Sequence, residues 1–257
     1  MSTIHAVPAF KDNYLWVIAS GRHAAVVDPG DAEPIERFLA DRDLALDAIL
    51  ATHHHSDHVG GLMALAAHWR CPVFGPAGEK IEGIGRRLAE GDRIRVPGIE
   101  IDLEVLDVPG HTAGHIAYVD AEEKAFVFCG DTLFACGCGR LFEGTPEQMS
   151  RSLAKLARLP GPARVYCAHE YTLSNIRFAE AVEPGNAKLA ERKARESARR
   201  ERGEPTVPST IGEELATNPF LRCAEPEVIA SAERHAGHAL RGEVEVFAEI
   251  RGWKNSF

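Results

Sequence analysis

Short runs of apolar and often β-branched residues alternate with turn-forming residues over the first two thirds of the chain. Runs of this kind, bounded by Gly, Pro, Asn or Asp, are typical of β-strands. The predicted strands cover residues 14–19, 24–28, 48–52, 99–108, 116–119, 125–129 and 164–167. Amphipathic stretches at residues 34–42, 59–70 and 146–159 predict helices between them. This part of the chain therefore predicts sheets covered by helices.

After about residue 170 the strand pattern nearly disappears and helical periodicity takes its place. The predicted helices cover residues 173–182, 187–202, 211–216, 226–236 and 244–253. Residues 203–210 form the clearest loop, and Thr210 with Glu213 three positions later is typical of a helix N-cap. We therefore predict an α/β protein with two domains, a sheet-containing domain at residues 1–169 and a smaller all-helical domain at residues 170–257.

The composition is that of a globular protein, with 45% hydrophobic and 26% charged residues among 257. The formal net charge of −9 makes general binding to nucleic acid unfavourable. The first residues lack the basic and apolar segments of a secretory signal, and no window approaches the ~18 apolar residues of a membrane span. We therefore expect a cytoplasmic protein without nucleic-acid or membrane partners.

The six cysteines are too sparse for a disulfide scaffold, so we expect reduced thiols. Cys136 and Cys138 are the only close pair. They lie in a Gly-rich run, which favours a tight turn over a metal-binding loop.

One predicted helix departs from the acidic character of the chain. Residues 186–202 carry seven Lys or Arg against three Glu. The first interpretation is a solvated face with ion pairs at i,i+4 spacing. The second is a basic rim that attracts anions beside an active site.

A dense group of imidazole and carboxylate side chains follows the predicted strand at residues 48–52. The segment contains His53, His54, His55, Asp57 and His58. Side chains alternate along extended backbone, so His53 and His55 point to one side and His54 to the other. Asp57 and His58 lie where the chain turns into the next helix, and they can face a second position nearby. This segment therefore offers ligands to two metal ions.

Three further donors follow other predicted strands, at the sheet edge where functional groups collect. They are His111, Asp131 and His169. We assign His53, His55 and His111 to one ion, Asp57, His58 and His169 to the other, and Asp131 as the bridge. Imidazole and carboxylate without thiolate suit zinc, iron or manganese, and a carboxylate can bridge two cations.

The neighbouring polar residues have less specialised expected roles. His54 and His115 are expected to be structural. Asp28 ends a strand, so it either orients a ligand imidazole through its second nitrogen or simply starts a turn. Gly60 and Gly61 would let helix and sheet approach closely.

The donors from His53 to His58, together with His111, Asp131 and His169, resemble the metallo-β-lactamase superfamily. This resemblance implies an αββα sandwich with the metals at one sheet edge. Other segments are similar to the glyoxalase II, or hydroxyacylglutathione hydrolase, family, and the likeness covers nearly the whole chain. These segments are residues 137–145, 166–172, 182–186, 212–222 and 251–254. Asp131 stands where β-lactamases of this class typically offer Cys, which argues against antibiotic hydrolysis.

The resemblance also implies a binding site for glutathione, to which the helical domain contributes. Its residues would be Arg140, Phe142, Tyr171, Arg251 and Lys254. Animal members usually have Lys and Tyr at the first two positions, so Arg140 keeps the charge whereas Phe142 lacks a hydroxyl. The alternative for Arg251 and Lys254 is that they are helix C-terminal cations that interact with the helix dipole.

The activity implied is hydrolysis of S-D-lactoylglutathione to D-lactate and glutathione, a step of methylglyoxal degradation. Two divalent metal ions, zinc before iron or manganese, would lower the pKa of a bridging water, and the resulting hydroxide would attack the thioester while Asp57 orients it. A thiolate leaves readily because the pKa of a thiol is only ~8.5. We expect a monomer.

Three alternatives remain open. The first is another binuclear metallohydrolase of this fold, such as a phosphodiesterase, nuclease or lactonase. The second is a single-iron sulfur dioxygenase, and the third is a metal-binding protein without catalysis.

Overall fold

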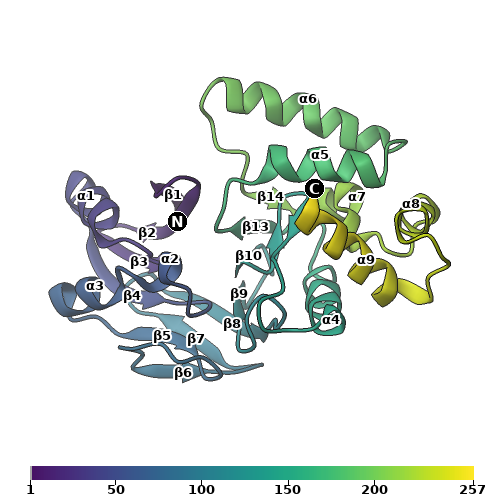
Figure 1. Cartoon of the computed structure of the whole chain (residues 1–257). Helices are drawn as coiled ribbons and strands as arrows, with labels where there is room; N and C mark the ends of the chain where they lie inside the picture. Colours follow the sequence, from purple (N-terminus) through teal and green to yellow (C-terminus); the bar gives the residue numbers. More distant parts are fainter. Residues whose placement is uncertain (1) are drawn as a thin grey trace. The chain divides into compact units, whose positions relative to one another are not determined.

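The computed structural model describes residues 2–257, which form two compact units (Figure 1). Unit 1 comprises the described residues up to Asp107 together with Thr112–Gly130. Unit 2 comprises Val108–His111 and Asp131–Phe257. No helix within residues 2–257 combines the length and apolar character that crossing a membrane requires.

The first sheet of unit 1 has the strand order β1-β2-β3-β4-β5-β6. Strands β1 to β3 pair antiparallel, and β3 to β6 pair parallel. The strands are β1 (Thr3–Ala9), β2 (Asn13–Ser20), β3 (His23–Val27), β4 (Ala45–Leu50), β5 (Val73–Pro76) and β6 (Arg86–Leu88). Parallel strands bring their carboxyl ends to one edge, so the residues after β3 and β4 lie close together.

Two helices pack on this sheet (Figure 1). They are α1 (Ala32–Arg42) and α3 (Leu62–Trp69), and the short α2 (Ser56–Val59) precedes α3. Ile35 and Leu39 of α1 and Leu62 and Leu65 of α3 are buried in one apolar cluster with the sheet. Burial of this apolar surface holds the helices in place.

A second set of strands completes unit 1. They lie in the order β10 (Phe126–Gly130), β9 (Ile116–Asp120), β8 (Ile101–Asp107) and β7 (Arg93–Val96), all antiparallel. Tyr118 of β9 is buried and donates a hydrogen bond from its hydroxyl to the carbonyl oxygen of Ala51 at 2.8 Å. This bond ties the second set of strands to the chain just after β4.

The helix predicted at residues 59–70 is confirmed as α3, but it begins later, at Leu62, because Gly60 and Gly61 separate it from the short α2. A Cβ at Gly60 would lie 2.5 Å from the carbonyl oxygen of Gly30, and one at Gly61 would lie 2.4 Å from the nitrogen of Ala32. These glycines therefore allow a close approach, but to the loop after β3 and not, as predicted, to the sheet itself. The strands β1, β5, β6 and β7 were not predicted.

Unit 2 is mainly helical. Its helices are α4 (Pro146–Leu156), α5 (Thr172–Val182), α6 (Ala187–Glu201), α7 (Ile211–Thr217), α8 (Pro226–Ala236) and α9 (Gly242–Ser256), with the 3-10 helix η1 (Pro219–Leu221). The two short strands β11 (Leu133–Phe134) and β12 (Gly137–Cys138) form a hairpin, and β13 (Arg164–Cys167) pairs with β14 (Ser209–Thr210). The predicted turn around Cys136 and the Thr210 cap on the amide of Glu213 are both confirmed.

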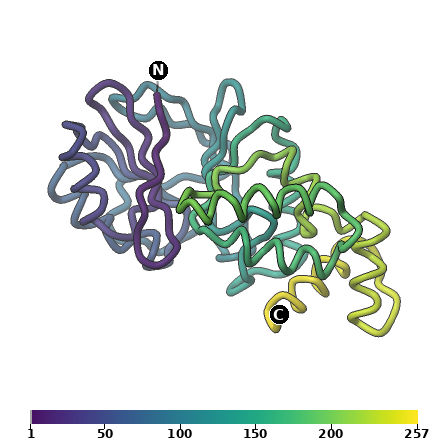
Figure 2. The backbone as a smooth tube through the Cα atoms, turned by 90° about the horizontal axis from the view of Figure 1, so that it is seen from above, coloured from purple at the N-terminus to yellow at the C-terminus, as the bar shows by residue number. Residues whose placement is uncertain are grey.

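Helix α6 lies beside α5 (Figure 2) and contains most of the predicted basic stretch. Its cations form ion pairs, but mainly with other elements: Arg192 with Glu214 and Lys193 with Glu180. Along the helix itself, Arg199 pairs with Glu196 at i,i+3 spacing. The pairs therefore connect α6 to the rest of unit 2 more than they stabilise the helix alone.

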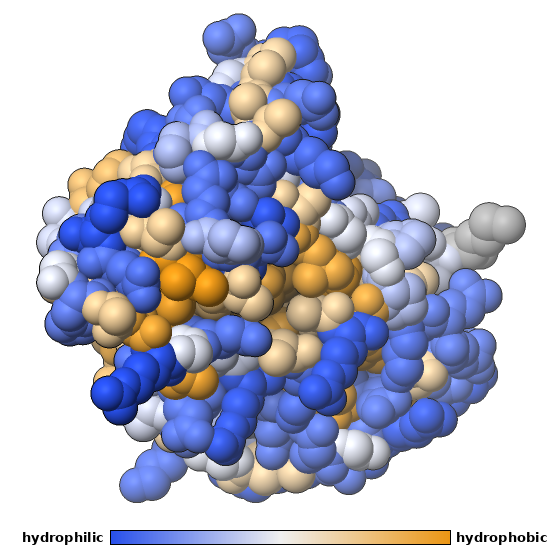
Figure 3. All heavy atoms as spheres, turned by 90° about the vertical axis from the view of Figure 1, so that its right-hand side faces the viewer, coloured by the Kyte–Doolittle hydropathy of each residue, from blue (hydrophilic) through white to orange (hydrophobic). Residues whose placement is uncertain are grey.

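Figure 3 looks onto the side where α8 and α9 lie. Hydrophilic side chains cover most of this face, and apolar side chains show between them. The large apolar side chains that unit 2 exposes are Phe142, Leu215, Val244 and Phe257. Exposed apolar side chains are ordinary on a folded protein. Phe142 differs from the other three because it lines a pocket.

Candidate metal-binding residues and substrate pocket

Unit 1 brings four of the predicted metal ligands together where the chain leaves β4 and enters α2. The Nε2 atom of His53 lies 3.1 Å from Nδ1 of His55. The Nε2 atom of His58 lies 3.6 Å from Oδ2 of Asp57. Ligand atoms about 2.0–2.1 Å from one tetrahedral ion are roughly 3.3 Å apart, so each pair fits one ion.

Asp28 orients two of these imidazoles. It is 3% exposed and accepts hydrogen bonds from the amide and hydroxyl of Thr52, both at 2.7 Å, and from Nδ1 of His58 at 3.0 Å. Because the Thr52 hydroxyl donates to Asp28, its oxygen accepts from Nδ1 of His53 at 3.1 Å. Both rings are thereby protonated at Nδ1 and present a basic Nε2, as metal-ligating imidazoles require. Both predicted roles of Asp28 are therefore seen, since its side chain orients the imidazoles and its carbonyl oxygen accepts the amide of Gly30 at 2.9 Å in a turn.

Asp57 is held by a residue that the sequence did not single out. The buried side chain of Asn13, at the start of β2, donates from Nδ2 to Oδ2 of Asp57 at 3.0 Å. This bond fixes the direction of the carboxylate. The pairing is between residues 44 positions apart, so no local sequence signal reveals it.

The other two histidines of this region have structural surroundings, as expected. His54 pairs with the buried carboxylate of Glu79, which also accepts the hydroxyl of Thr112 at 2.6 Å. His115 is fully buried, stacks on His53 with ring centroids 4.5 Å apart, and contacts the carbonyl oxygen of Ile116 through Nδ1 at 3.0 Å.

Unit 2 brings the remaining three predicted ligands together. Asp131 lies between two imidazoles, with Oδ2 at 3.4 Å from Nε2 of His111 and Oδ1 at 3.4 Å from Nε2 of His169. The Nδ1 atom of His111 donates to the carbonyl oxygen of Arg140 at 2.8 Å, which leaves Nε2 as the basic nitrogen. Each carboxylate oxygen therefore faces a different imidazole, an arrangement suited to a bridging ligand.

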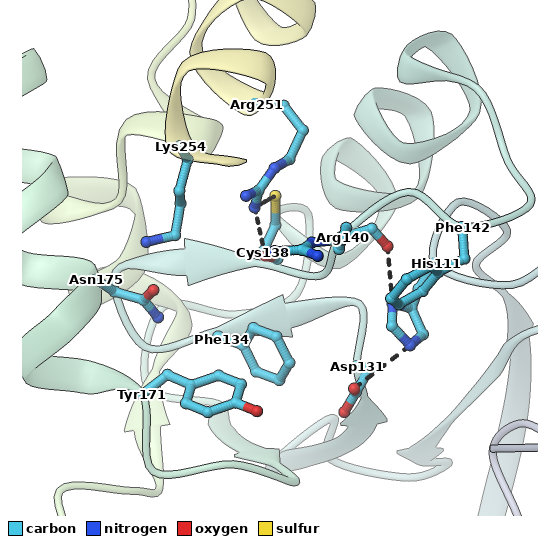
Figure 4. Close-up of a pocket in the computed structure, with 10 residues that line it drawn as sticks. All are labelled: His111, Asp131, Phe134, Cys138, Arg140, Phe142, Tyr171, Asn175, Arg251 and Lys254. Carbon is cyan, nitrogen blue, oxygen red and sulfur yellow. Dashed lines mark hydrogen bonds and ion pairs between the residues drawn. The ribbon is translucent and has the colours of Figure 1, made fainter. Parts of the chain in front are cut away.

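A pocket of about 300 Å³ lies within unit 2 (Figure 4). It is lined by all five residues assigned to glutathione by resemblance and by two of the predicted metal ligands. The full lining is His111, Asp131, Phe134, Cys138, Arg140, Phe142, Tyr171, Asn175, Arg251 and Lys254. One cavity thus joins cationic side chains to Asp131.

Two cations of α9, Arg251 and Lys254, belong to this lining. Arg251 is 5% exposed and donates from Nη1 to the carbonyl oxygen of Cys138 at 2.9 Å. Burial, and then the charge of Arg251, lower the pKa of Lys254 to about 8. The ammonium of Lys254 lies 5.0 Å from the ring centre of Phe178. The pocket therefore holds two concentrated positive charges that a carboxylate would offset.

Aromatic rings line the pocket opposite these cations (Figure 4). Tyr171 stacks on His169 with centroids 4.7 Å apart and planes 2° apart, and Phe134 contacts both rings edge-on. Phe142 contacts His111 edge-on at 5.3 Å. These rings extend the apolar wall from the pocket to the predicted metal ligands.

Three lining residues were missed by sequence reasoning as substrate contacts: Phe134, Cys138 and Asn175. Phe134 and Cys138 lie in the hairpin, and Asn175 lies one turn into α5. The Gly-rich run marked the hairpin as a turn but gave no sign that it faces a cavity. Burial raises the pKa of the Cys138 thiol above its ordinary value, although the charge of Arg251 acts in the opposite direction. A thiol with a raised pKa is a poor metal ligand, because metal ions bind the thiolate.

The donors in both units fit divalent metal ions. They are imidazole and carboxylate groups, each of the four pairs of donor atoms has a separation suited to two ligands of the same ion, and hydrogen bonds orient the rings. Such hard and borderline donors suit zinc, iron and manganese alike.

The sequence of residues 12–169 matches the sequence model of the metallo-beta-lactamase superfamily. Residues 170–257 match that of the hydroxyacylglutathione hydrolase C-terminus. A hydroxyacylglutathione hydrolase of Cupriavidus taiwanensis is 57% identical over 266 residues, with both chains covered completely. One of Nitrosomonas europaea is 52% identical, covering 100% of this chain and 97% of its own.

Among solved structures, a crystal structure of TTHA1623 in a di-iron-bound form is similar, with 26% identity and a TM-score of 0.60. The match covers 85% of this chain and all of that one. The fold and the site thus define a member of the metallo-beta-lactamase superfamily. Within it, the chain belongs to the hydroxyacylglutathione hydrolase family. The predicted α/β fold class and the family resemblance are both confirmed.

Proposed function

We propose that the chain is a metal-dependent thioester hydrolase that cleaves S-(2-hydroxyacyl)glutathione. The proposed substrate is S-D-lactoylglutathione, with D-lactate and glutathione as products, as in methylglyoxal degradation. The observation that carries this proposal is a pocket in unit 2 that contains Arg140, Arg251 and Lys254 together with His111 and Asp131. Its cationic side chains can bind the carboxylates of the glutathione part. Its metal ligands can hold an ion that acts on the thioester.

We propose two divalent metal ions, zinc in the first place, with iron or manganese accepted by the same donors. The ligands would be His53, His55 and His111 for one ion, Asp57, His58 and His169 for the other, and Asp131 for both. Three lines of support are the short separations within each unit, the superfamily to which the chain belongs, and the di-iron form of TTHA1623. Bound ions would supply an acidic water and positive charge for the carbonyl oxygen.

The chain's own residues bind and orient the reactants. Arg251 and Lys254 would hold a carboxylate of the glutathione part, and Arg140 a second one. Tyr171 and Phe142 would flank the peptide, so the thioester would reach the end of the pocket where Asp131 lies. Asp57, fixed by Asn13, would orient the attacking water by accepting its hydrogen bond.

The bond cleaved is the carbon–sulfur bond of the thioester. The water oxygen forms a new bond to the carbonyl carbon, the sulfur leaves with the electron pair, and the water proton goes to solvent. Because the pKa of a thiol is only about 8.5, the thiolate leaves without a strong side-chain acid. This agrees with the pocket lining, in which Asp131, the proposed metal bridge, is the one carboxyl side chain among the ten residues.

The metal-loaded protein should hydrolyse S-D-lactoylglutathione, measured by the loss of thioester absorbance. A panel of phosphodiester, lactone and glutathione thioester substrates separates this function from other binuclear hydrolases of the same fold. If no glutathione thioester is cleaved, the proposal is wrong. A sulfur dioxygenase would instead consume oxygen, which an oxygen electrode detects.

Lys254→Met should raise KM for the thioester about tenfold, since a charge-assisted hydrogen bond contributes about 1.5–3 kcal/mol. The value of kcat should change little, because Lys254 lies away from the reacting bond. Lys193→Met is the matched control, since Lys193 pairs with Glu180 on the surface of α6 outside the pocket. Equal KM values for the two variants would contradict a glutathione role for Lys254.

The affinity for glutathione should fall above pH 8. Burial first, and then Arg251, lower the pKa of Lys254 to about 8, with Arg177, Cys136 and Cys138 also acting on it. The ammonium is therefore present below pH 8 and lost above it. Calorimetric titration with S-methylglutathione, which lacks a thiol, should show weaker binding from pH 7 to 9. Lys254→Met should flatten that decline, because it removes the ammonium that titrates. The analogue's own amine titrates equally with both proteins, so it does not contribute to the difference between them.

The lowered pKa of Lys254 also makes the free energy of unfolding depend on pH. The pKa of Lys254 is lowered on folding, so the unfolded chain binds more protons between pH 8 and the ordinary lysine range. This residue's contribution to stability therefore rises with pH across that window. Urea denaturation of the wild type relative to Lys254→Met should show the difference.

The domain boundary between residues 169 and 170, the monomeric state and the cytoplasmic location stay predictions.

A further inference from the structure

The hairpin of β11 and β12 supplies the pocket with Phe134 and Cys138, and Arg140 follows two residues later. Its strands are only two residues long, and the turn residue Cys136 has a φ of 55°, which is uncommon for a side chain other than Gly. A hairpin this short is not stable by itself. Its conformation must therefore come from the groups packed around it.

Side chains of unit 2 that lie outside this hairpin bind its backbone at successive residues. Glu214 of α7 accepts the amide of Cys136 through Oε2 at 2.8 Å. Asn218 donates from Nδ2 to the carbonyl oxygens of Phe134 at 3.2 Å and Gly137 at 2.9 Å. Asn175 and Arg251 bind the carbonyl oxygens of Ala135 and Cys138, both at 2.9 Å.

Glu214 is the central group of this arrangement. It is fully buried, and its Oε2 also accepts Nδ2 of Asn218 at 3.0 Å. Its Oε1 accepts Nη2 of Arg192 at 2.7 Å, and Arg192 also donates from Nη1 to the hydroxyl of Thr217 at 2.6 Å. Arg192 is 1% exposed and belongs to the basic helix α6. A buried ion pair of this kind is weak evidence for stability, but it can fix one geometry.

We propose that Glu214, held by Arg192 and joined to Asn218, is a positioning residue that fixes the hairpin and so sets the shape of the glutathione pocket. Glu214 does not line that pocket and acts only through the hairpin backbone. The basic helix then has a role that neither a solvated face nor an anion-attracting rim describes: its Arg192 orients the carboxylate of Glu214. This inference rests on the proposed function for its kinetic readout.

The variants Glu214→Ala and Glu214→Gln separate positioning from general destabilisation. Alanine removes the acceptor for the Cys136 amide, whereas glutamine keeps one carbonyl oxygen for it. We expect KM for S-D-lactoylglutathione to rise about tenfold in Glu214→Ala and less in Glu214→Gln, with kcat changed less than KM. Partial rescue by the conservative variant is the expected sign of a positioning hydrogen bond.

Glu183→Gln is the matched control. Glu183 is also buried and binds a guanidinium, that of Arg222, from Nε at 2.8 Å and from Nη2 at 2.6 Å. It has no contact with the hairpin among the hydrogen bonds described for residues 2–257. Its loss should lower the melting temperature while KM stays at the wild-type value. An equal rise of KM in Glu183→Gln and Glu214→Gln would overturn the proposal.

Amide hydrogen exchange gives a readout that does not depend on the reaction. The Cys136 amide should exchange slowly in the wild type, faster in Glu214→Ala and at the wild-type rate in Glu183→Gln. If Glu214→Ala does not fold, Asn218→Ala gives the test, since it frees the carbonyl oxygens of Phe134 and Gly137 and leaves the Arg192–Glu214 pair in place.

The outcomes distinguish this inference from the proposed function. A wild-type protein that cleaves no glutathione thioester contradicts the proposed function, while exchange still tests the hairpin. Unchanged exchange in the Glu214 and Asn218 variants, or faster exchange without a rise in KM in an active protein, overturns the positioning role.

Discussion

Asp131→Asn should lower kcat/KM for S-D-lactoylglutathione by more than about a hundredfold. Loss of a residue that only hydrogen-bonds to a metal ligand already lowers metal affinity or activity by about 10–100-fold. The carboxylate of Asp131 presents one oxygen to His111 and the other to His169, each at 3.4 Å from Nε2. An amide carries no negative charge and turns an NH₂ group toward one of these positions. The variant would thus lose both the charge and one ligand atom that the proposed two-metal centre needs.

Metal content and activity should be measured on the same sample of Asp131→Asn. We expect less than two bound ions per chain and an activity that added zinc, iron or manganese does not restore. Asp120→Asn is the control, since Asp120 accepts backbone amides in the turn after β9. Full metal content together with wild-type kcat in Asp131→Asn would contradict the bridging role.

Removal of metal from the wild type complements this experiment. Dialysis against a chelator should abolish thioester hydrolysis, and readdition of a divalent ion should restore it, with the helical content unchanged by circular dichroism. A protein that stays fully active without detectable metal would contradict the proposed mechanism.

The local parts of the candidate site could be predicted from the sequence because their geometry is set over a few residues. The alternation rule correctly brought His53 and His55 together, with His54 directed to Glu79. The rule succeeded although β4 ends at Leu50 and the histidines lie beyond it. What mattered was the spacing of two residues, which keeps both rings on one side of a short stretch of chain.

Partners that are distant in the sequence could not be predicted. Asn13 fixes Asp57 from another strand, and Glu214 receives Arg192 from another helix. The predicted i,i+4 pairs of the basic helix failed for the same reason, since the acidic partners of its cations come mostly from elements folded against it. Tertiary contacts of this kind have no periodic signal.

The pocket shows a third situation, in which the residues were predicted by resemblance and not by physical reasoning. Nothing in the spacing of Arg140, Tyr171 and Lys254 indicates a shared cavity, and a helix-dipole role for Arg251 and Lys254 was equally consistent with their place near the end of α9. Arg251 is instead directed to the carbonyl oxygen of Cys138, a contact between residues 113 positions apart that only the folded chain brings together.

Asp28→Asn tests whether imidazole orientation, rather than direct ligation, limits the metal affinity. Asp28 has a φ of 53°, and Asn tolerates this left-handed conformation well, so the backbone should not change. The amide oxygen can still accept the Thr52 amide, but its NH₂ group then faces the Thr52 hydroxyl and Nδ1 of His58, which are both donors.

To avoid that conflict, the rings of His58 and His53 would move their protons to Nε2, the nitrogen needed for the metal. We therefore expect a loss of roughly 10–100-fold in metal affinity or in kcat/KM. Competition with a series of chelators measures the affinity, and the activity at saturating metal shows whether ligation can be recovered.

Asp31→Asn is the control for this experiment. Asp31 lies in the same loop and caps α1 by accepting the amide of Glu33 at 3.1 Å, a role that Asn fills equally well. It should keep wild-type metal affinity. If Asp28→Asn also keeps it, the relay from Asp28 through Thr52 to His53 does not determine the ring tautomers. The basic nitrogens would then have to be set by the metal ions themselves.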